Sequence, residues 1–193
     1  MKYQDFLECQ SLKKTDLLAW ANQTLIEDVV VSIPSLPAPP MLMFDRMTKI
    51  QRQKKGGVIV AEQDIHLDAW YFLCHFRNDP VQPGCLGVDA IWQLLGMYCA
   101  LSGAKGSGRA LGCKEVDFFG QIRPHDKTVR YEVNVRRYSE VQGVSLVIGS
   151  GSVFVDDVKI YTVEDAKVGV FSEIQYADYP HKSGNSKGGL TKK

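Results

Sequence analysis

The sequence predicts one α+β domain in which a strongly curved antiparallel sheet wraps around a single long helix. The chain has 193 residues, which suits one domain with a real core and is short for two. Residues 84–104 are apolar around nearly the whole helix circumference, which is typical of a buried helix. Four β-rich segments follow closely, and a parallel crossover would need a dozen or more connecting residues. Wrapping an antiparallel sheet around the helix is the simplest way to bury it.

The N-terminal part predicts a short helix followed by an extended segment. Thr15 or Asp16 can cap a helix in "DLLAWANQTL", residues 16–25. Four prolines between residues 34 and 40 exclude a helix or interior strand, so we expect an extended lead-in on the domain surface. The predicted organisation is an N-terminal helix and lead-in over residues 1–35, the main domain over 36–172 and a disordered tail over 173–193.

The strands are predicted from alternation and turn chemistry. Residues 41–65 read as two strands around a turn at 54–57. The four later segments span 108–122, 128–141, 144–157 and 158–171, with turns at 123–126, 142–143 and 156–157. Such closely spaced segments predict an antiparallel meander.

Composition limits the function. With 45% hydrophobic and 23% charged residues the chain is typical of a globular protein. A formal net charge of +1 gives no global attraction to nucleic acid or anionic lipid. No secretory signal and no window of ~18 apolar residues is found, so we expect a cytoplasmic protein without membrane insertion. Five cysteines without a CxxC pair predict reduced core thiols, no disulfide framework and no metal site.

Asp89 is the only carboxylate of the predicted central helix. Burying a carboxylate without a partner costs several kcal/mol or forces it to take up a proton, so such a residue usually has a partner or a task. The alternative is purely structural, because the nearby helix N-terminus also favours an anion. Both interpretations stay open from the residues alone.

His75 and the loop that follows it form a second candidate. A lone histidine between Cys74 and Phe76 is commonly a satisfied, half-buried ring. The loop "RNDPVQPGCLG" nevertheless leads into the helix and is expected to be rigid because of its prolines. Gly84, at the helix N-terminus, would let a ligand approach unpaired backbone N–H groups. A base, an acid in apolar surroundings and such a helix start suit removal of a proton α to a thioester and expulsion of a β-hydroxyl, without metal or redox cofactor.

Four long motifs, in order, carry a resemblance to a known family. Over about residues 36–171 the chain closely resembles the bacterial β-hydroxydecanoyl-acyl carrier protein dehydratase/isomerase family. The motifs are "LPAPPMLMFDRM", "CHFRNDPVQPGCLGVDAIWQLLGMY", "GRALGCKEVDFFGQIRP" and "IYTVEDAKVGVF".

The resemblance implies a hot dog fold and a homodimer with active sites at the interface, each combining a histidine of one subunit with an acid of the other. His75 matches the catalytic histidine, Asp89 the catalytic acid, and Gly84 the backbone donor to the thioester carbonyl. An aspartate at position 89 resembles the dehydratase/isomerase branch, whereas dehydratases that do not isomerise carry glutamate. The implied substrate is a 3-hydroxyacyl chain of about ten carbons on the phosphopantetheine arm of acyl carrier protein, with no other cofactor.

A basic docking patch for acyl carrier protein is also implied. The candidates are Arg136, Arg137 and Lys167, with Lys127 and Arg130 nearby, and a solvated charged face is the alternative. Cys85 at the helix start could be reactive, but packing is the favoured role because elimination needs no acyl-enzyme.

Two other functions compete with the dehydratase. One is a hot dog thioesterase in which Asp89 activates water, and the other is an acyl-binding protein without turnover. The spacing from His75 to Asp89 favours elimination over hydrolysis. Retention of both residues argues against a binding protein, because a buried acid without a task is a standing cost.

Overall fold

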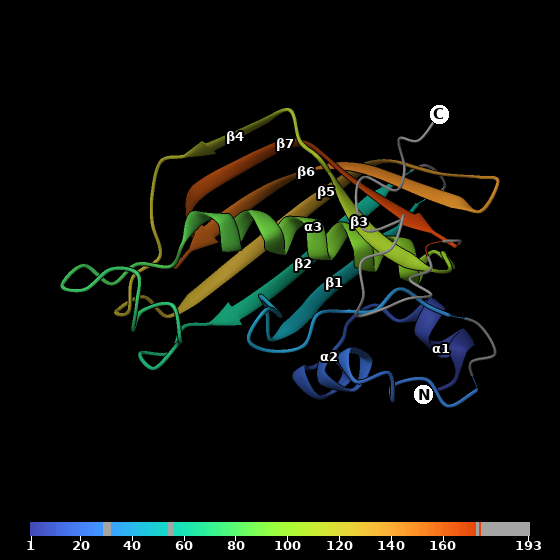
Figure 1. Cartoon of the computed structure of the whole chain (residues 1–193), viewed down its shortest axis with the longest axis horizontal. Helices are drawn as coiled ribbons and strands as arrows, with labels where there is room; N and C mark the ends of the chain where they lie inside the picture. The colour runs from blue at the N-terminus through green and yellow to red at the C-terminus, as the bar shows by residue number, and fades with distance from the viewer. Residues whose placement is uncertain (29–31, 54–55, 173, 175–193) are drawn as a thin grey trace, which may run out of the picture.

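The computed structural model describes residues 1–28, 32–53, 56–172 and 174, and it shows one sheet, one long helix and a small helical N-terminal part (Figure 1). In chain order the elements are α1 (Tyr3–Glu8), α2 (Lys14–Ala21), β1 (Arg46–Arg52), β2 (Gly57–Asp64), α3 (Gly84–Leu101), β3 (Ser107–Gly112), β4 (Glu115–Phe118), β5 (Thr128–Val141), β6 (Val144–Val155) and β7 (Val158–Phe171). The predicted α+β class, a curved antiparallel sheet with a helix packed against it, is confirmed.

The seven strands form one sheet in the order β1-β2-β5-β6-β7-β3, with β4 also paired to β7. Every pairing is antiparallel. The predicted meander holds for β5, β6 and β7 but is wrong for the segment 108–122, which pairs with β7 at the far side rather than with β5. That segment also divides into β3 and β4, because Gly112 adopts a φ of +131° and shifts the register against β7.

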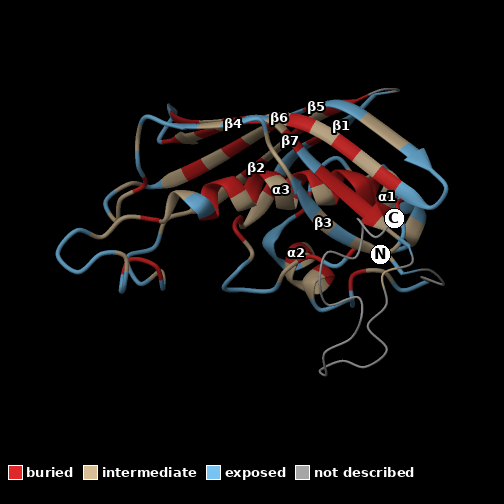
Figure 2. Cartoon of the chain, turned by 45° about the horizontal axis from the view of Figure 1, so that its top comes forward, coloured by how far each residue is buried: buried red, intermediate tan, exposed pale blue. Residues whose placement is uncertain are grey.

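The sheet packs on α3 through backbone positions that have no side chain. A Cβ atom at Gly151 of β6 would lie 2.6 Å from Ile91 Cδ1, and one at Gly87 of α3 would lie 2.7 Å from the Tyr161 ring. Contacts this close leave no room for a methyl group, so these glycines allow the helix and strands to approach. Buried residues alternate with half-buried ones along β6, as Figure 2 shows.

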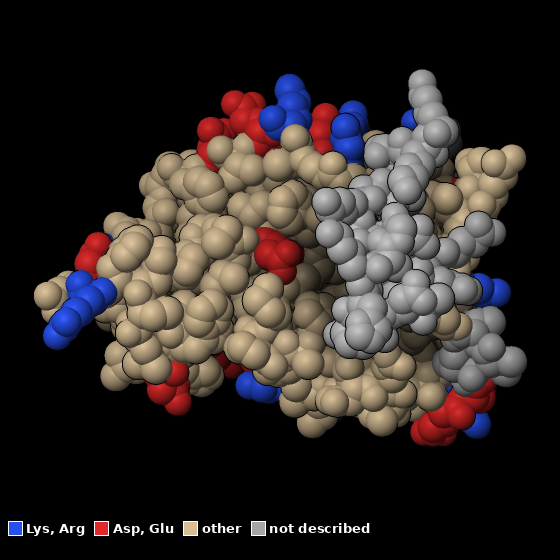
Figure 3. Space-filling model, in the orientation of Figure 1, with Lys and Arg blue, Asp and Glu red and all other residues tan. Residues whose placement is uncertain are grey.

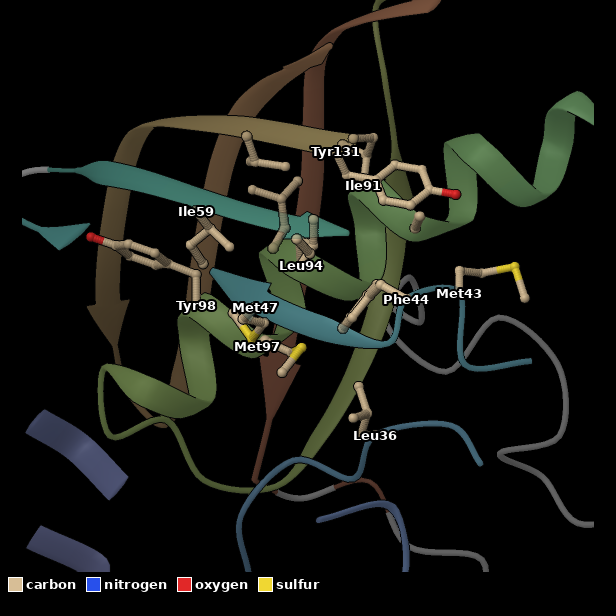
Figure 4. Close-up of a cluster of buried hydrophobic side chains, with 14 of the residues drawn as sticks. Leu36, Met43, Phe44, Met47, Ile59, Ile91, Leu94, Met97, Tyr98 and Tyr131 are labelled. Atoms are coloured by element: carbon tan, nitrogen blue, oxygen red, sulfur yellow. The ribbon is translucent and has the colours of Figure 1, made fainter. Parts of the chain in front are cut away.

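The core lies between α3 and the concave face of the sheet. Ile91, Leu94 and Tyr98 of α3 have at most 2% of their surface exposed. Figure 4 shows them among side chains from the strands and from the segment before β1. The Tyr98 hydroxyl donates a hydrogen bond of 2.7 Å to the Gly56 carbonyl, which satisfies its polar tip inside the core.

One face of α3 is not covered by the sheet, which corrects the prediction that the helix is buried nearly all round. Cys85, Asp89, Trp92, Gln93 and Gly96 are exposed or half-buried. Their spacing of four, seven, eight and eleven residues places them on one helical face. This stripe contains the one carboxylate of α3, and it is the surface on which the candidate site is built.

By length and hydropathy α3 could also span a membrane, contrary to the sequence-based expectation, but 72% of its 18-residue window is buried inside the fold. A core helix of a soluble domain passes the same test of length and composition. The described residues therefore explain the apolar character of α3 by packing against the sheet.

The N-terminal part departs from the prediction in its helices and in its proline segment. A helix not predicted, α1, precedes α2. The predicted cap at Thr15 or Asp16 is wrong, because α2 begins at Lys14 with Lys13 as its N-cap, and it ends at Ala21, before Gln23 with a φ of +59°. The proline segment does not merely lie on the surface, because Pro34 and Leu36 are buried.

Of the predicted tail at 173–193, all but residue 174 lies outside the described residues.

The cysteines are only partly as predicted. All five are free thiols, but only Cys99 is buried. Cys74 and Cys85 are exposed, so their predicted packing role is wrong. Burial raises the pKa of the Cys99 thiol to about 12, so it stays protonated at neutral pH.

Replacing Leu94 with alanine should lower the free energy of unfolding by about 2–5 kcal/mol, because Leu94 is fully buried between α3 and the sheet. Urea denaturation followed by circular dichroism at fixed protein concentration measures the change. Val141→Ala, at a position that is 65% exposed, is the matched control and should alter stability by about 0.5 kcal/mol or less. Equal effects of the two substitutions would contradict the assignment of the core.

Candidate active site

The loop between β2 and α3, residues 65–83, is held by hydrogen bonds to the turn before β5. The Gln82 N–H donates to the Ile122 carbonyl at 3.0 Å. The Arg123 guanidinium forms an ion pair with Asp79 and donates to the Pro80 carbonyl at 3.2 Å. These bonds connect two chain segments about 40 residues apart, so the path of the loop is fixed by the sheet and not by the prolines alone.

His75 is half-buried in this loop with its ring orientation fixed. Its backbone N–H donates to the Tyr71 carbonyl at 2.8 Å, and the Val81 N–H donates to the His75 carbonyl at 2.8 Å. Its Nδ1 lies 2.9 Å from the Val81 carbonyl oxygen. Because a carbonyl oxygen only accepts, Nδ1 carries the proton and the neutral ring keeps the lone pair on Nε2. His75 is therefore arranged as a base at Nε2.

Gly84 is the first residue of α3, directly after Pro83. Its N–H has no hydrogen bond to another described residue, as expected for the first turn of a helix. A Cβ at this position would lie 2.7 Å from the Phe118 ring, so glycine keeps the helix start free of steric conflict. The helix dipole and this N–H together favour a carbonyl oxygen that gains negative charge.

Asp89 is half-buried on the uncovered stripe of α3 and is hydrogen-bonded to Gln93, which sequence reasoning missed. The Gln93 Nε2 donates to Asp89 Oδ2 at 2.6 Å and to the Met41 carbonyl at 2.7 Å. The Met43 N–H donates to Gln93 Oε1 at 3.2 Å. The available signal was the spacing of four residues between Asp89 and Gln93, at which the two side chains meet on a helix. On the face that carries α3, Figure 3 shows acidic atoms, in red, surrounded by uncharged atoms, in tan.

A cavity of about 280 Å³ opens beside Asp89. Asp89, Trp92, Gln93, Gly96 and Met97 form its α3 wall. His75 does not line it, and in the described part of the chain no hydrogen bond or ion pair joins His75 to Asp89. Within one described chain, His75 and the cavity beside Asp89 are therefore separate.

The structure divides the five candidate docking residues into two groups. Arg137 and Lys167 flank Ile148 in one row across β5, β6 and β7, and the neighbouring Arg136 is paired with Asp165 at 2.8 Å. Lys127 and Arg130 lie toward the other end of β5, and six residues of strand separate Arg130 from Arg136 by about 20 Å. Arg130 is also paired with Asp157 at 3.2 Å and stacks on the Phe154 ring. The two groups therefore cannot form one compact patch.

Gln82 follows Val81, the acceptor of His75, and its side chain is buried close to the Tyr131 hydroxyl. It is 1% exposed, and neither amide atom of its side chain makes a hydrogen bond within the described chain. Nearby in the loop and sheet, the Tyr131 hydroxyl donates to Gln63 at 3.0 Å, and Gln63 donates to the Tyr71 hydroxyl at 3.4 Å. Burial raises the pKa of Tyr71 to about 12 and raises that of Tyr131 as well, so both phenols are neutral at physiological pH.

No cluster of three or more His, Cys, Asp or Glu side chains suited to a metal ion occurs in the part of the chain that the structure describes. The groups that the site offers are the His75 imidazole, the Asp89 carboxyl and the backbone N–H of Gly84. Together they can move protons and stabilise an oxyanion.

Comparison with known proteins identifies the family of the chain. Residues 36–164 match the model of the FabA-like domain family, well over half of the chain. A dehydratase heterocomplex, ApeI:P from Xenorhabdus doucetiae, is similar with a TM-score of 0.53 and 12% identity, covering 68% of this chain and 84% of that one. A hypothetical thioesterase with coenzyme A from Streptococcus pneumoniae TIGR4 has a TM-score of 0.48 and 9% identity, covering 64% and 83%. At 12% identity the likeness to the dehydratase heterocomplex shows a shared fold alone.

Substitutions at Gln82 should distinguish how the volume and the polarity of its side chain contribute to the free energy of unfolding. Gln82→Met should leave the free energy of unfolding unchanged or raise it by about 1 kcal/mol, because an unpaired buried amide is removed at similar volume. Gln82→Glu should be destabilising at pH 7, because burial raises the pKa of the new carboxyl above its unfolded value of about 4.3.

Urea denaturation at several pH values checks this pair against the wild type. The penalty of Gln82→Glu should be complete above the raised pKa and vanish as the pH falls below about 4.3, where the carboxyl is protonated in both states. A loss of more than about 2 kcal/mol in Gln82→Met would instead show that the amide makes a stabilising hydrogen bond.

Proposed function

Because the chain belongs to the FabA-like domain family, within the hot dog superfamily of dehydratases and thioesterases, we propose that it dehydrates a 3-hydroxyacyl thioester carried on acyl carrier protein. The product is the trans-2-enoyl thioester, part of which the same site isomerises to the cis-3-enoyl thioester. The preferred substrate is the 3-hydroxydecanoyl chain.

The observation that carries the proposal is the state of His75. Its Nδ1 proton is engaged by the Val81 carbonyl at 2.9 Å, so its Nε2 is a base with a fixed direction. The same loop continues directly to Gly84, whose N–H is available to a thioester carbonyl. A base and an oxyanion donor on one rigid loop support removal of a proton from the carbon next to that carbonyl.

The reaction follows from these groups. His75 Nε2 takes the proton from C2 while the Gly84 N–H stabilises the enolate oxygen. The C3–O bond breaks, the electron pair of the enolate forms the C2–C3 double bond, and a protonated Asp89 gives its proton to the departing hydroxyl, which leaves as water. In isomerisation a proton is removed from C4 and one is added at C2 through His75. The Gln93 hydrogen bond holds the Asp89 carboxyl toward the cavity.

We propose that the active protein is a homodimer that brings His75 of one protomer to Asp89 of its partner. In the single chain the two residues are not joined, and the α3 stripe with Asp89 is uncovered. Strand β3 ends the sheet with no described strand on its outer side. Large apolar side chains are also exposed in the His75 loop, where Leu73 is 76% and Phe76 55% exposed. Exposed apolar surface and an open strand edge each favour association.

Acyl carrier protein is the proposed partner of the row formed by Arg137 and Lys167, together with Arg136. Their side chains are exposed on neighbouring strands, as binding to an acidic surface requires. Lys127 and Arg130 lie too far along β5 to join this contact. A solvated charged face remains the alternative for both groups.

His75→Ala and Asp89→Asn should each lower turnover of 3-hydroxydecanoyl-acyl carrier protein by about 10²–10⁴-fold, because each removes a proton-transfer group. Chromatography and mass spectrometry of the products distinguish the trans-2 and cis-3 enoyl thioesters from free acid. Circular dichroism should show both variants folded. Free acid as the main product would support a thioesterase, and absence of turnover in the wild type would support a binding protein.

Mixing the two inactive variants tests the shared site. When His75→Ala and Asp89→Asn chains are unfolded together and refolded, a heterodimer contains one site with both native residues. Random pairing should therefore restore about a quarter of wild-type activity, since half of the dimers are mixed and each has one of two sites intact. A mixture that stays inactive, with mixed dimers demonstrated by native mass spectrometry, would place both residues of a site in one chain.

A further inference from the structure

We propose that Gly96 and Gly108 determine the length of acyl chain that the protein accepts, by leaving open the cavity that begins at Asp89 and is closed by the N-terminal segment. The inference rests on the proposed function, because it assigns the cavity to the hydrocarbon part of the substrate of that same site. It adds that the length of the acyl chain is limited by two glycines, which lack side chains, and by the N-terminal segment, which closes the cavity.

The cavity extends along α3 away from the acid. Its α3 wall runs from Asp89 to Met97, and these eight residue steps correspond to about 12 Å along the helix axis. The Asp89–Gln93 pair makes one part of this wall polar, and Met97 at its far end is apolar. Opposite α3 lie Gly108 and Val168 of the sheet. An acyl chain with its oxygen-bearing carbon at Asp89 would place its hydrocarbon tail in the apolar part.

The remaining wall comes from the N-terminal segment. Trp20 of α2 is 2% exposed, and its Nε1 donates to the Pro34 carbonyl at 2.9 Å. Phe6 packs edge-on against the Trp20 ring, with centroids 4.8 Å apart. Leu36 is 5% exposed, and Figure 4 shows it on the same side of the core as Met97. Buried apolar groups anchored by a hydrogen bond make this a fixed wall, which suits a hydrocarbon occupant.

Two glycines leave the cavity open. A Cβ atom at Gly96 or at Gly108 would meet no atom within 4 Å, although both residues line the cavity. Gly87 and Gly151, in contrast, are needed for close packing. A glycine inside a helix costs about 0.5–1 kcal/mol relative to alanine, and no packing contact within the described residues of the chain explains Gly96. Open space toward the substrate is the physical reason that the structure offers for it.

The test compares substrates of increasing length on variants that add carbon at these positions. Gly96→Ala, Gly96→Leu and Gly108→Val are assayed with 3-hydroxybutyryl, 3-hydroxyhexanoyl and 3-hydroxydecanoyl thioesters. Gly96→Leu should lower kcat/KM for the decanoyl substrate by about 10-fold or more while leaving that for the butyryl substrate nearly unchanged, since each excluded methylene alters discrimination by about that factor. Gly96→Ala should give a smaller change in the same direction.

The butyryl substrate is the internal control for folding and for an intact site. Equal loss with all three substrates in a folded dimer, or no change with any of them, would overturn the proposal. If Gly96→Leu does not fold, Gly108→Val tests the opposite wall, where a β-branched residue suits a strand.

Failure of the proposed function is separable from failure of this inference. Wild-type protein that turns over none of the three substrates refutes the function but not the cavity. Decanoyl-pantetheine is then titrated while the fluorescence of Trp20 and Trp92, which line the cavity, is recorded. Binding that is weakened about 10-fold or more by Gly96→Leu supports the inference, and equal binding by both proteins overturns it.

Discussion

Burial of α3 by the curved sheet is the constraint on which the rest of the structure depends. Glycines 87 and 151 let the helix and the strands approach to distances at which a methyl group would collide with Tyr161 or Ile91. Because the helix is held so closely, its orientation is fixed along its length. The position of the Gly84 N–H in its first turn is therefore fixed relative to the sheet. One face of the helix is left uncovered by the sheet.

That uncovered face gives Asp89 its environment. The carboxyl is neither in bulk solvent nor in the core, and the Gln93 amide ties it to the backbone of the segment before β1. The amide donor and the partial exposure together avoid the cost of several kcal/mol that full burial without a partner would impose on the carboxyl. The same face supplies one wall of the cavity.

The position of His75 depends on different elements of the fold. The position of His75 is determined by backbone carbonyls within its own loop, and the loop is held against residues 122–123 by Gln82, Asp79 and Pro80. Asp89 is thus positioned by the helix, and His75 by the loop and the sheet. A site assembled from such half-sites in two protomers would depend on dimerisation for activity, whereas each chain could fold around its own core.

The sequence by itself predicted the long apolar helix and the strand segments, and it identified His75, Asp89 and Gly84 as candidate site residues. This was possible because periodicity and turn chemistry are local properties of the chain. The tertiary structure decided that segment 108–122 pairs with β7, that Pro34 and Leu36 are buried, and that only Arg137, Lys167 and Arg136 come together. It also revealed the Gln93 contacts and the open space beside Gly96. These features depend on which distant segments meet, and that is set by sheet topology and packing rather than by local pattern.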